Sequence, residues 1–186
     1  MIGYAFCGSF CTLSASLEVL RNLSKYEPDI LPIMSDAVYS TDTRFWQAED
    51  FREKVKAICK RDPIHTIKDA EPLGPKIKLD ALIISPCTGN TLAKLANGIT
   101  DTPVTMAAKA HLRSDRPLLI ALASNDALSA NLKNIATMLS RKSVYFVPMH
   151  QDDPKNKPHS LVCGFEHLLC AYEKMKLSEQ LTPLFL

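Results

Sequence analysis

The chain has 186 residues, of which 46% are hydrophobic and 23% charged, and its 22 basic and 20 acidic residues give a net charge of +2. This length suits one domain with a full hydrophobic core, and the composition excludes a disordered, fibrous or coiled-coil protein. Because the charges nearly balance, the chain has no excess of positive charge to bind a nucleic-acid backbone, and we expect no nucleic-acid partner. We expect residues 1–186 to form one domain.

Short apolar runs alternate with longer amphipathic runs along the chain, which is typical of βαβ units. The expected strands are 2–6, 29–34, 80–85, 117–123 and 144–147, with a further short strand near 64–67. The expected helices are 13–26, 45–60, 91–97, 103–112, 132–141 and 162–177. Because βαβ crossovers are right-handed, we predict a three-layer α/β fold with a doubly wound parallel sheet, Rossmann-like or flavodoxin-like.

The connecting segments carry more prolines and polar residues. Residues 35–42 are expected to form a polar loop, and residues 151–158 a turn-rich excursion. The segment 63–79 contains Pro63, Pro72, Gly74 and Pro75, so much of it is expected to be irregular.

The chain shows no targeting, membrane or metal signal. Residues 1–6 are apolar, but they lack a basic leader and are too short for a signal-peptide core. No apolar run approaches the roughly 20 residues of a membrane span. The six cysteines form no C-x-x-C pair and have no histidines beside them at zinc-ligand spacing. We therefore expect a cytoplasmic protein with free thiols, no membrane contact and no metal.

The loops at the carboxyl ends of the strands are the expected place for a ligand. These loops are 7–12, 35–44, 85–91, 124–131 and 148–153. They are rich in small hydroxyl and amide side chains, which suit a ligand with many hydrogen-bonding groups.

Gly8 and Ser9 lie between the first strand and the first helix. The free amides of a helix N-terminus attract a phosphate, and a glycine lets that phosphate approach the backbone. Equally, Ser9 or Thr12 could simply cap the helix. The turn lacks both a G-x-G-x-x-G fingerprint and a P-loop lysine, so a mononucleotide phosphate fits better than a dinucleotide or a P-loop ligand.

The second candidate turn, Pro86-Cys87-Thr88-Gly89-Asn90-Thr91, follows the central strand. An ordinary βα turn would explain it, but its expected position beside loop 7–12 favours a shared pocket. On that hypothesis Ser9 and Asn90 lie around one cavity.

Residues 80–103 resemble the core of the homo-oligomeric flavin-containing cysteine decarboxylases, which carry Pro-Ala-Ser-Ala-Asn-Thr after the same strand and then a helix and a Gly-Ile-x-Asp turn. Within that superfamily, essentially the whole chain resembles the family of dipicolinate synthase B subunits. The segments that carry this closer resemblance are 40–45, 70–76, 85–110, 124–128 and 151–158.

The resemblance implies a flavin cofactor, FMN. By position, Gly8 and Ser9 would hold its phosphate, and Ser35, Thr41 and Thr43 would hold the phosphate or the ribityl hydroxyls. The residues implied along the isoalloxazine ring are Pro86, Cys87, Thr88, Asn90 and Thr91.

The chain departs from the decarboxylases at two places. Their Pro-x-Met-Asn-x-x-Met-Trp substrate motif is replaced by Ala-Ser-Asn-Asp-Ala-Leu at 123–128, where only Asn125 matches. Their active-site histidine has no counterpart in 71–76, and the nearest histidine, His65, is out of register and better explained as structural.

Catalytic residues cannot be assigned from the sequence, and three candidates remain. They are Asn125, Asp126 and Arg44. Arg44 could clamp a phosphate or a carboxylate, or pair with Glu49 or Asp50 on the surface. Asp126 could accept a proton, or cap a turn or helix.

The resemblance implies a flavin-binding subunit that forms dipicolinate from a dihydro- or hydroxytetrahydro-dipicolinate intermediate of the lysine pathway in the mother cell of a sporulating bacterium. It implies a small dicarboxylate substrate, a partner A subunit that supplies NADP, and a homo-oligomer. Two alternatives remain: a flavin-dependent decarboxylase of a cysteine-derived substrate, and a non-catalytic scaffold subunit.

Overall fold

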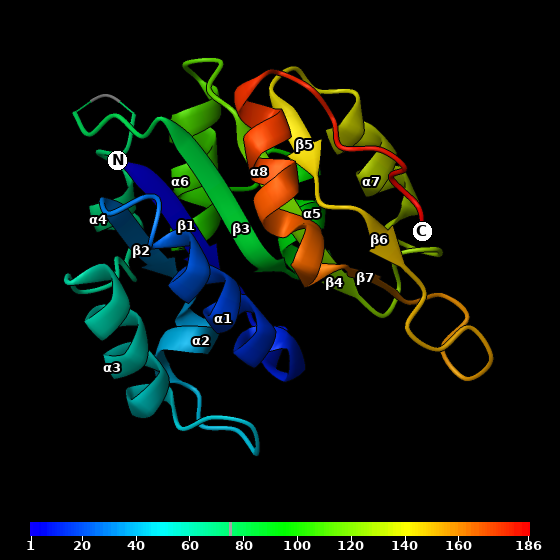
Figure 1. Cartoon of the computed structure of the whole chain (residues 1–186), viewed down its shortest axis with the longest axis horizontal. Coiled ribbons are helices and arrows are strands. Elements are labelled where there is room, and N and C mark those ends of the chain that lie inside the picture. The colour runs from blue at the N-terminus through cyan, green and yellow to red at the C-terminus, as the bar shows by residue number, and fades with distance from the viewer. Residues whose placement is uncertain (75) are drawn as a thin grey trace.

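The computed structural model describes residues 1–74 and 76–186 and contains one seven-stranded sheet between two layers of helices (Figure 1). The strand order is β2-β1-β3-β4-β7-β6, with β5 pairing with β4. The strands are β1 (Ile2–Phe6), β2 (Ile30–Met34), β3 (Ala81–Cys87), β4 (Leu118–Ser124), β5 (Val144–Phe146), β6 (Met149–His150) and β7 (Leu161–Cys163). The first five strands run parallel, as their apolar runs predict.

The sheet is mixed rather than wholly parallel, because β7 pairs antiparallel with β4 and with β6. The sequence pattern does not indicate these two short strands. β7 takes up the beginning of the segment predicted as the last helix, so that helix starts only after Gly164. Residues 151–158 therefore belong to the connection between β6 and β7. This connection projects beyond the rest of the chain in Figure 1.

The helices divide between the two faces of the sheet. They are η1 (Phe10–Thr12), α1 (Leu13–Leu23), α2 (Asp36–Ser40), α3 (Ala48–Cys59), α4 (Ile67–Ala70), α5 (Gly89–Ala96), α6 (Pro103–Leu112), α7 (Leu132–Leu139), η2 (Phe165–His167) and α8 (Leu168–Lys176). Figure 1 shows α1, α3 and α8 in front of the sheet and α5 and α6 behind it.

Alternate residues of each strand supply two separate cores. Tyr4 and Ile83 belong to the core with α1, α3 and α8, whereas Ala5 and Ile84 belong to the core with α4 to α7. This is the alternation that a sheet buried on both faces requires. The three-layer α/β fold predicted from the sequence is confirmed.

Several elements differ from their predicted bounds for local reasons. Residues 35–42 contain the short helix α2 rather than a loop only, with Val38 buried in the core. Helix α3 begins at Ala48 rather than residue 45, because Thr43 Oγ1 accepts the amides of Phe45 and Trp46 and so forms a turn there.

The strand predicted near 64–67 is reduced to a single bridge between Ile33 and Ile64. Thr66 then caps α4 by accepting the amide of Asp69. Strand β3 extends through Pro86 to Cys87, and its pairing with β4 shifts register between Ile84 and Cys87, which accommodates the missing proline amide. The irregularity expected at Pro75 lies outside the described residues.

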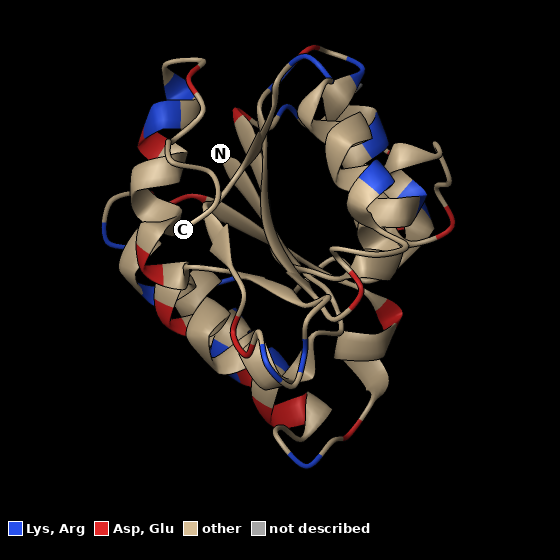
Figure 2. Cartoon of the chain, turned by 90° about the vertical axis from the view of Figure 1, so that its right-hand side faces the viewer, with Lys and Arg blue, Asp and Glu red and all other residues tan. Residues whose placement is uncertain are grey.

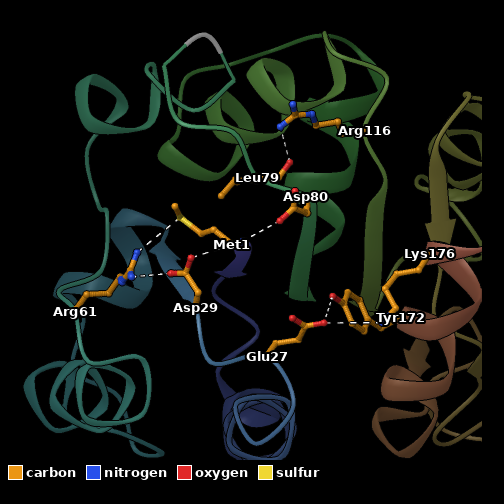
Figure 3. A network of polar contacts seen from close by, with 9 residues as sticks. All are labelled: Met1, Glu27, Asp29, Arg61, Leu79, Asp80, Arg116, Tyr172 and Lys176. Carbon is orange, nitrogen blue, oxygen red and sulfur yellow. Dashed lines mark hydrogen bonds and ion pairs between the residues drawn. The ribbon is translucent and has the colours of Figure 1, made fainter.

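Polar groups at the amino ends of the strands form hydrogen bonds and ion pairs with one another (Figure 3). The amino group of Met1 donates to Asp80 at 2.8 Å, and Arg61 pairs with Asp29 at 2.8 Å. The Tyr172 hydroxyl donates to Glu27 at 2.8 Å and so ties α8 to the segment after α1. These contacts tie the segments at the amino ends of the strands to one another.

Charged residues of both signs are interspersed over the helices and loops (Figure 2). Within the described residues, no helix is both long and apolar enough to cross a membrane. No group of three or more His, Cys, Asp or Glu side chains in this part of the chain is arranged to hold a metal ion. All six cysteines are free thiols.

Candidate functional site

A cavity of about 530 Å³ lies at the carboxyl ends of the central strands. Four segments of the chain form it: the turn after β1, the turn after β3, the end of β4, and the loop between β6 and β7 with β7 itself. The residues that line it are Gly8, Ser9, Cys11, Thr12, Thr88, Gly89, Asn90, Ala123, Ser124, Asn125, Asp126, Asp152, Lys157, Ser160 and Val162. Ser9 and Asn90 therefore face one cavity.

The first turn leaves Ser9 able to donate a hydrogen bond. The Thr12 hydroxyl lies 2.9 Å from the Ser9 carbonyl oxygen and 3.0 Å from Ser9 Oγ, so Ser9 Oγ accepts a hydrogen bond from Thr12 and its own hydrogen remains available to donate. Neither Ser9 nor Thr12 caps a helix with its side chain. Helix capping by these two side chains, the alternative explanation of this turn, is therefore wrong.

Gly8 has room beside it for a small side chain. A Cβ atom there would lie 3.5 Å from Ala37 Cβ and from the Phe10 ring, which is ordinary van der Waals distance. Packing within the chain therefore does not require glycine at this position. A glycine does permit a bulky anion to approach the backbone of the turn.

Ser35 stands beside this turn, at the end of β2. Its amide donates to the Phe6 carbonyl at 3.0 Å, but its buried Oγ has no hydrogen-bond partner among the described residues. Buried polar groups are nearly always satisfied, so this hydroxyl has a hydrogen bond still to donate, but Ser35 is not among the residues that line the cavity.

The central turn ends in the N-terminus of α5. Thr88 Oγ1 accepts the amide of Thr91 at 3.2 Å, so this threonine is a helix cap. The preceding amides of Gly89 and Asn90 lie at the positive end of the helix, where they can bind an anionic or polar ligand. Thr91 itself is buried behind the cap.

Gly89 is required by close packing. A Cβ atom there would lie 2.3 Å from Ser124 Oγ and 2.7 Å from both Asn131 Nδ2 and Asp126 Oδ1. The turn after β3 is therefore pressed against the polar loop after β4, and only a residue without a side chain fits between them.

Asp126 is the centre of that polar loop. Ser124 Oγ donates to Asp126 Oδ1, and Asn131 Nδ2 donates to both carboxylate oxygens at 2.9 Å. These hydrogen bonds, that of Ser124 first, lower the pKa of Asp126 below its ordinary value. A carboxylate so satisfied holds the loop in place and is a poor proton acceptor, which favours the structural interpretation of Asp126.

The other two catalytic candidates lie in different surroundings. Asn125 is exposed and lines the cavity. Arg44 is exposed but outside the lining, with its guanidinium 4.8 Å from the centre of the Phe45 ring. Among the described residues, Arg44 forms no ion pair with Glu49 or Asp50.

Thr41 and Thr43 also lie outside the cavity lining. Thr41 is exposed at the end of α2, and the Thr43 hydroxyl is occupied by the turn that precedes α3. His65 is stacked on Tyr39, with ring centroids 3.7 Å apart, as a structural histidine would be.

Three cysteines lie near the site: Cys11 is exposed and lines the cavity, whereas Cys7 and Cys87 are buried thiols. Burial raises the pKa of Cys7 to about 11 and that of Cys87 well above its ordinary value. Neither ionises near neutral pH, so neither can act as a thiolate nucleophile. Cys87 and Pro86 lie behind the cavity wall rather than among its lining residues.

Part of the lining carries no signal in the sequence. Gly89 lies within the expected central turn but had no predicted role, and Lys157 and Ser160 belong to a loop with the composition of a surface excursion. Only the antiparallel pairing of β7 with β4 brings that loop to the cavity, and no local pattern shows this pairing.

A larger hollow, of about 620 Å³, lies between α1 and α8. Its lining is mainly apolar and includes Leu23, Leu169 and Leu177. None of its lining residues belongs to a turn at a carboxyl strand end, so it lacks the amides and hydroxyls that gather in the other cavity.

The parallel sheet, the glycine turn and the helix N-terminus define an α/β protein of the Rossmann-like class with a ligand cavity at the strand ends. A model of the family described as Flavoprotein matches residues 2–177, and the chain belongs to that family. It is 39% identical over 183 residues to the B subunit of dipicolinate synthase from Bacillus subtilis (strain 168), covering 98% of this chain and 92% of that protein.

Solved structures agree with this placement. The crystal structure of the B subunit of dipicolinate synthase from Bacillus halodurans C superposes with a TM-score of 0.89 at 36% identity, covering 100% of this chain and 95% of that one. The FMN-dependent cysteine decarboxylase SpaF superposes with a TM-score of 0.67 at 22% identity, covering 90% and 91%. The second similarity shows a shared fold.

Proposed function

We propose that the chain binds FMN in the cavity at the carboxyl ends of β1, β3 and β4 and acts as the flavin-bearing B subunit of a dipicolinate synthase. The observation that carries the proposal is the convergence of the first and central turns on one polar cavity. The 39% identity to the B subunit of a dipicolinate synthase over nearly the whole chain supports the assignment to this family of subunits.

The residues present fit a flavin mononucleotide. The cavity volume is within the roughly 300–1,000 Å³ of ligand pockets. The Gly8 turn, the Ser9 hydroxyl and the unpartnered Ser35 hydroxyl would hold the phosphate. Thr41 and Thr43 would reach the phosphate or the ribityl hydroxyls only after local rearrangement. Of the residues implied along the ring, Thr88 and Asn90 line the cavity and would contact it, whereas Pro86, Cys87 and Thr91 would support the turn from behind.

Conversion of a dihydrodipicolinate to dipicolinate removes one hydride and one proton, and conversion of a hydroxytetrahydro-dipicolinate also removes one water. A bound flavin would supply the acceptor for the hydride. The chain's own residues orient the reactants. The Asn125 amide offers both donors and acceptors to a substrate in the cavity. Asp126 keeps the loop that carries Asn125 fixed against the central turn through Ser124 and Asn131.

The proposal includes a separate A subunit that supplies NADP, a small dicarboxylate substrate and a homo-oligomer. It also places the protein in the cytoplasm of a sporulating mother cell. The name of the Bacillus subtilis relative supports a partner subunit and dipicolinate as the product. NADP, the homo-oligomer and the cell compartment are implied by the resemblance of the sequence alone.

A flavin-dependent decarboxylase is the second candidate. The fold shared with SpaF and the position of Asn125 in the cavity favour it. The stacking of His65 on Tyr39 and the absence of the rest of the substrate motif from the sequence count against it. Dipicolinate formation with an added A subunit, compared with decarboxylation of a cysteinyl peptide, distinguishes the two.

FMN binding is the first test, by titration of flavin fluorescence with the purified chain. We expect saturable binding, and a loss of at least about tenfold in affinity when Ser9→Ala and Ser35→Ala are combined, since each hydrogen bond to a charged group contributes about 1.5–3 kcal/mol. Ser40→Ala is the matched control, because Ser40 lies on α2 near Ser35 but donates only to Asp36 of its own helix. Absence of FMN binding would favour the scaffold alternative.

A further inference from the structure

One basic side chain lines the candidate cavity among the described residues, and it is Lys157. Other cations of the helices that follow β3 lie outside this cavity. Lys94 pairs with Asp101 at 2.8 Å, and Lys109 and Arg113 line a separate cavity with Arg141. A negatively charged group that enters the candidate cavity therefore finds its cationic partner in Lys157.

The loop that carries Lys157 is ordered by its own hydrogen bonds. The Lys157 amide donates to the Asp153 carbonyl at 2.7 Å, and the Ser160 amide donates to the Lys157 carbonyl at 3.1 Å. The Lys157 ammonium donates to Asp152 Oδ2 at 2.7 Å, and this hydrogen bond raises the pKa of Lys157. The lysine is thus held at the cavity and charged at neutral pH.

Asp152 leaves part of the ammonium available. A lysine ammonium has three donors, and Asp152 takes one of them, so two remain for a second acceptor. The other carboxylate of the cavity, Asp126, is already satisfied by Ser124 and Asn131. An incoming carboxylate can therefore share Lys157 with Asp152.

Lys157 lies on the connection between β6 and β7, beyond β4 in the order β2-β1-β3-β4-β7-β6, and Asn125 follows β4 itself. The Lys157 ammonium is also within electrostatic range of Cys11, which follows the Gly8 turn. Lys157 and Asn125 line the same cavity as Gly8 and Ser9, so the binding test must compare the affinities for FMN and for a carboxylate.

We propose that Lys157 is the specificity-determining residue that binds a carboxylate group of the substrate and selects dicarboxylates over neutral analogues. The chemical class of substrate follows from the Lys157 ammonium and the Asn125 amide on the lining of one cavity, since both can donate hydrogen bonds to an anionic oxygen. This inference rests on the proposed function for the position of the flavin.

The test is the affinity for dipicolinate, measured by calorimetry with and without saturating FMN in buffer freed of divalent cations. We expect Lys157→Ala to weaken dipicolinate binding at least about tenfold and Lys157→Arg to stay within about threefold of the wild type. Binding of the neutral pyridine-2,6-dicarboxamide should change less than twofold in Lys157→Ala. Lys155→Ala is the matched control, since Lys155 is exposed on the same loop outside the cavity lining.

FMN affinity separates this inference from the proposed function. Wild-type protein that binds dipicolinate but not FMN would overturn the proposed function, while the comparison of Lys157 variants still applies to the flavin-free chain. Equal dipicolinate affinity in Lys157→Ala and wild type, or no dipicolinate binding by either, would overturn the role of Lys157. A loss of FMN affinity in Lys157→Ala as large as the loss for dipicolinate would also overturn it, because the lysine would then bind the flavin phosphate.

Discussion

Substitution of Gly89 by alanine tests the contact between the two turns that form the candidate site. The added Cβ would lie 2.3 Å from Ser124 Oγ and 2.7 Å from Asp126 Oδ1 and Asn131 Nδ2. Backbone and side chains must separate to admit it, and the hydrogen bonds to the Asp126 carboxylate are the contacts that lie in the way.

The magnitude follows from three contributions. Inserting a methyl group into a tightly packed place costs about 1–3 kcal/mol. Losing one hydrogen bond to the carboxylate costs about 1.5–3 kcal/mol. Alanine favours a helix over glycine by up to about 1 kcal/mol, which opposes the first two. We expect Gly89→Ala to lower the free energy of unfolding by roughly 2–4 kcal/mol, and Tm by roughly 5–10 °C for a chain of this size.

Urea denaturation followed by circular dichroism measures this change. Adding Ser124→Ala to Gly89→Ala removes the nearest atom and should recover part of the lost stability. Surface substitutions usually change the free energy of unfolding by less than about 0.5 kcal/mol. If the change for Gly89→Ala is as small as that, the close contact is wrong and the two turns are not packed as described.

Two further predictions concern Gly8 and His111. Gly8→Ala should keep the free energy of unfolding within about 0.5 kcal/mol of the wild type, since its Cβ meets only ordinary contacts at 3.5 Å, but should weaken FMN binding by about tenfold or more, as fluorescence titration can measure. His111 is buried and bonded through Nε2 to the Pro117 carbonyl, and burial lowers its pKa. A group whose pKa is lower in the folded state resists protonation there, so stability should be complete above the unfolded pKa of about 6.5 and fall as pH drops below it. Urea denaturation at pH 7 and at pH 5.5 measures the free energy of unfolding that is lost between the two pH values. This loss should be smaller in His111→Gln than in the wild type, and an equal loss would contradict the lowered pKa of His111.

The strands of the parallel core were predictable because each is a short, nearly unbroken apolar run. Within the run at 80–85, every residue after Asp80 is buried, as the apolar composition indicated. The two antiparallel strands could not be read in this way. β6 has two residues and β7 three, and both depend on long-range pairing, of β7 with β4 and of β6 with β7, rather than on a local pattern.

The candidate site was predictable in outline but not in its contacts. The glycine turn at Gly8 and the turn around Asn90 stand at the ends of recognisable strands, so the topology alone brings them together. The exclusion of any side chain at Gly89 depends on Ser124 and Asp126, which belong to a distant part of the chain. Lys157 lies at the cavity because the pairing of β7 with β4 brings its loop there, and no local sequence pattern shows that pairing.

A crystal structure of the chain grown or soaked with FMN would locate the flavin and so decide whether the two turns form its site. We predict the phosphate within hydrogen-bonding distance of the Gly8 and Ser9 turn and of the Ser35 hydroxyl, with the ring along the turn that contains Asn90. A flavin bound instead in the apolar hollow between α1 and α8, or no flavin at saturating concentration, would contradict this prediction.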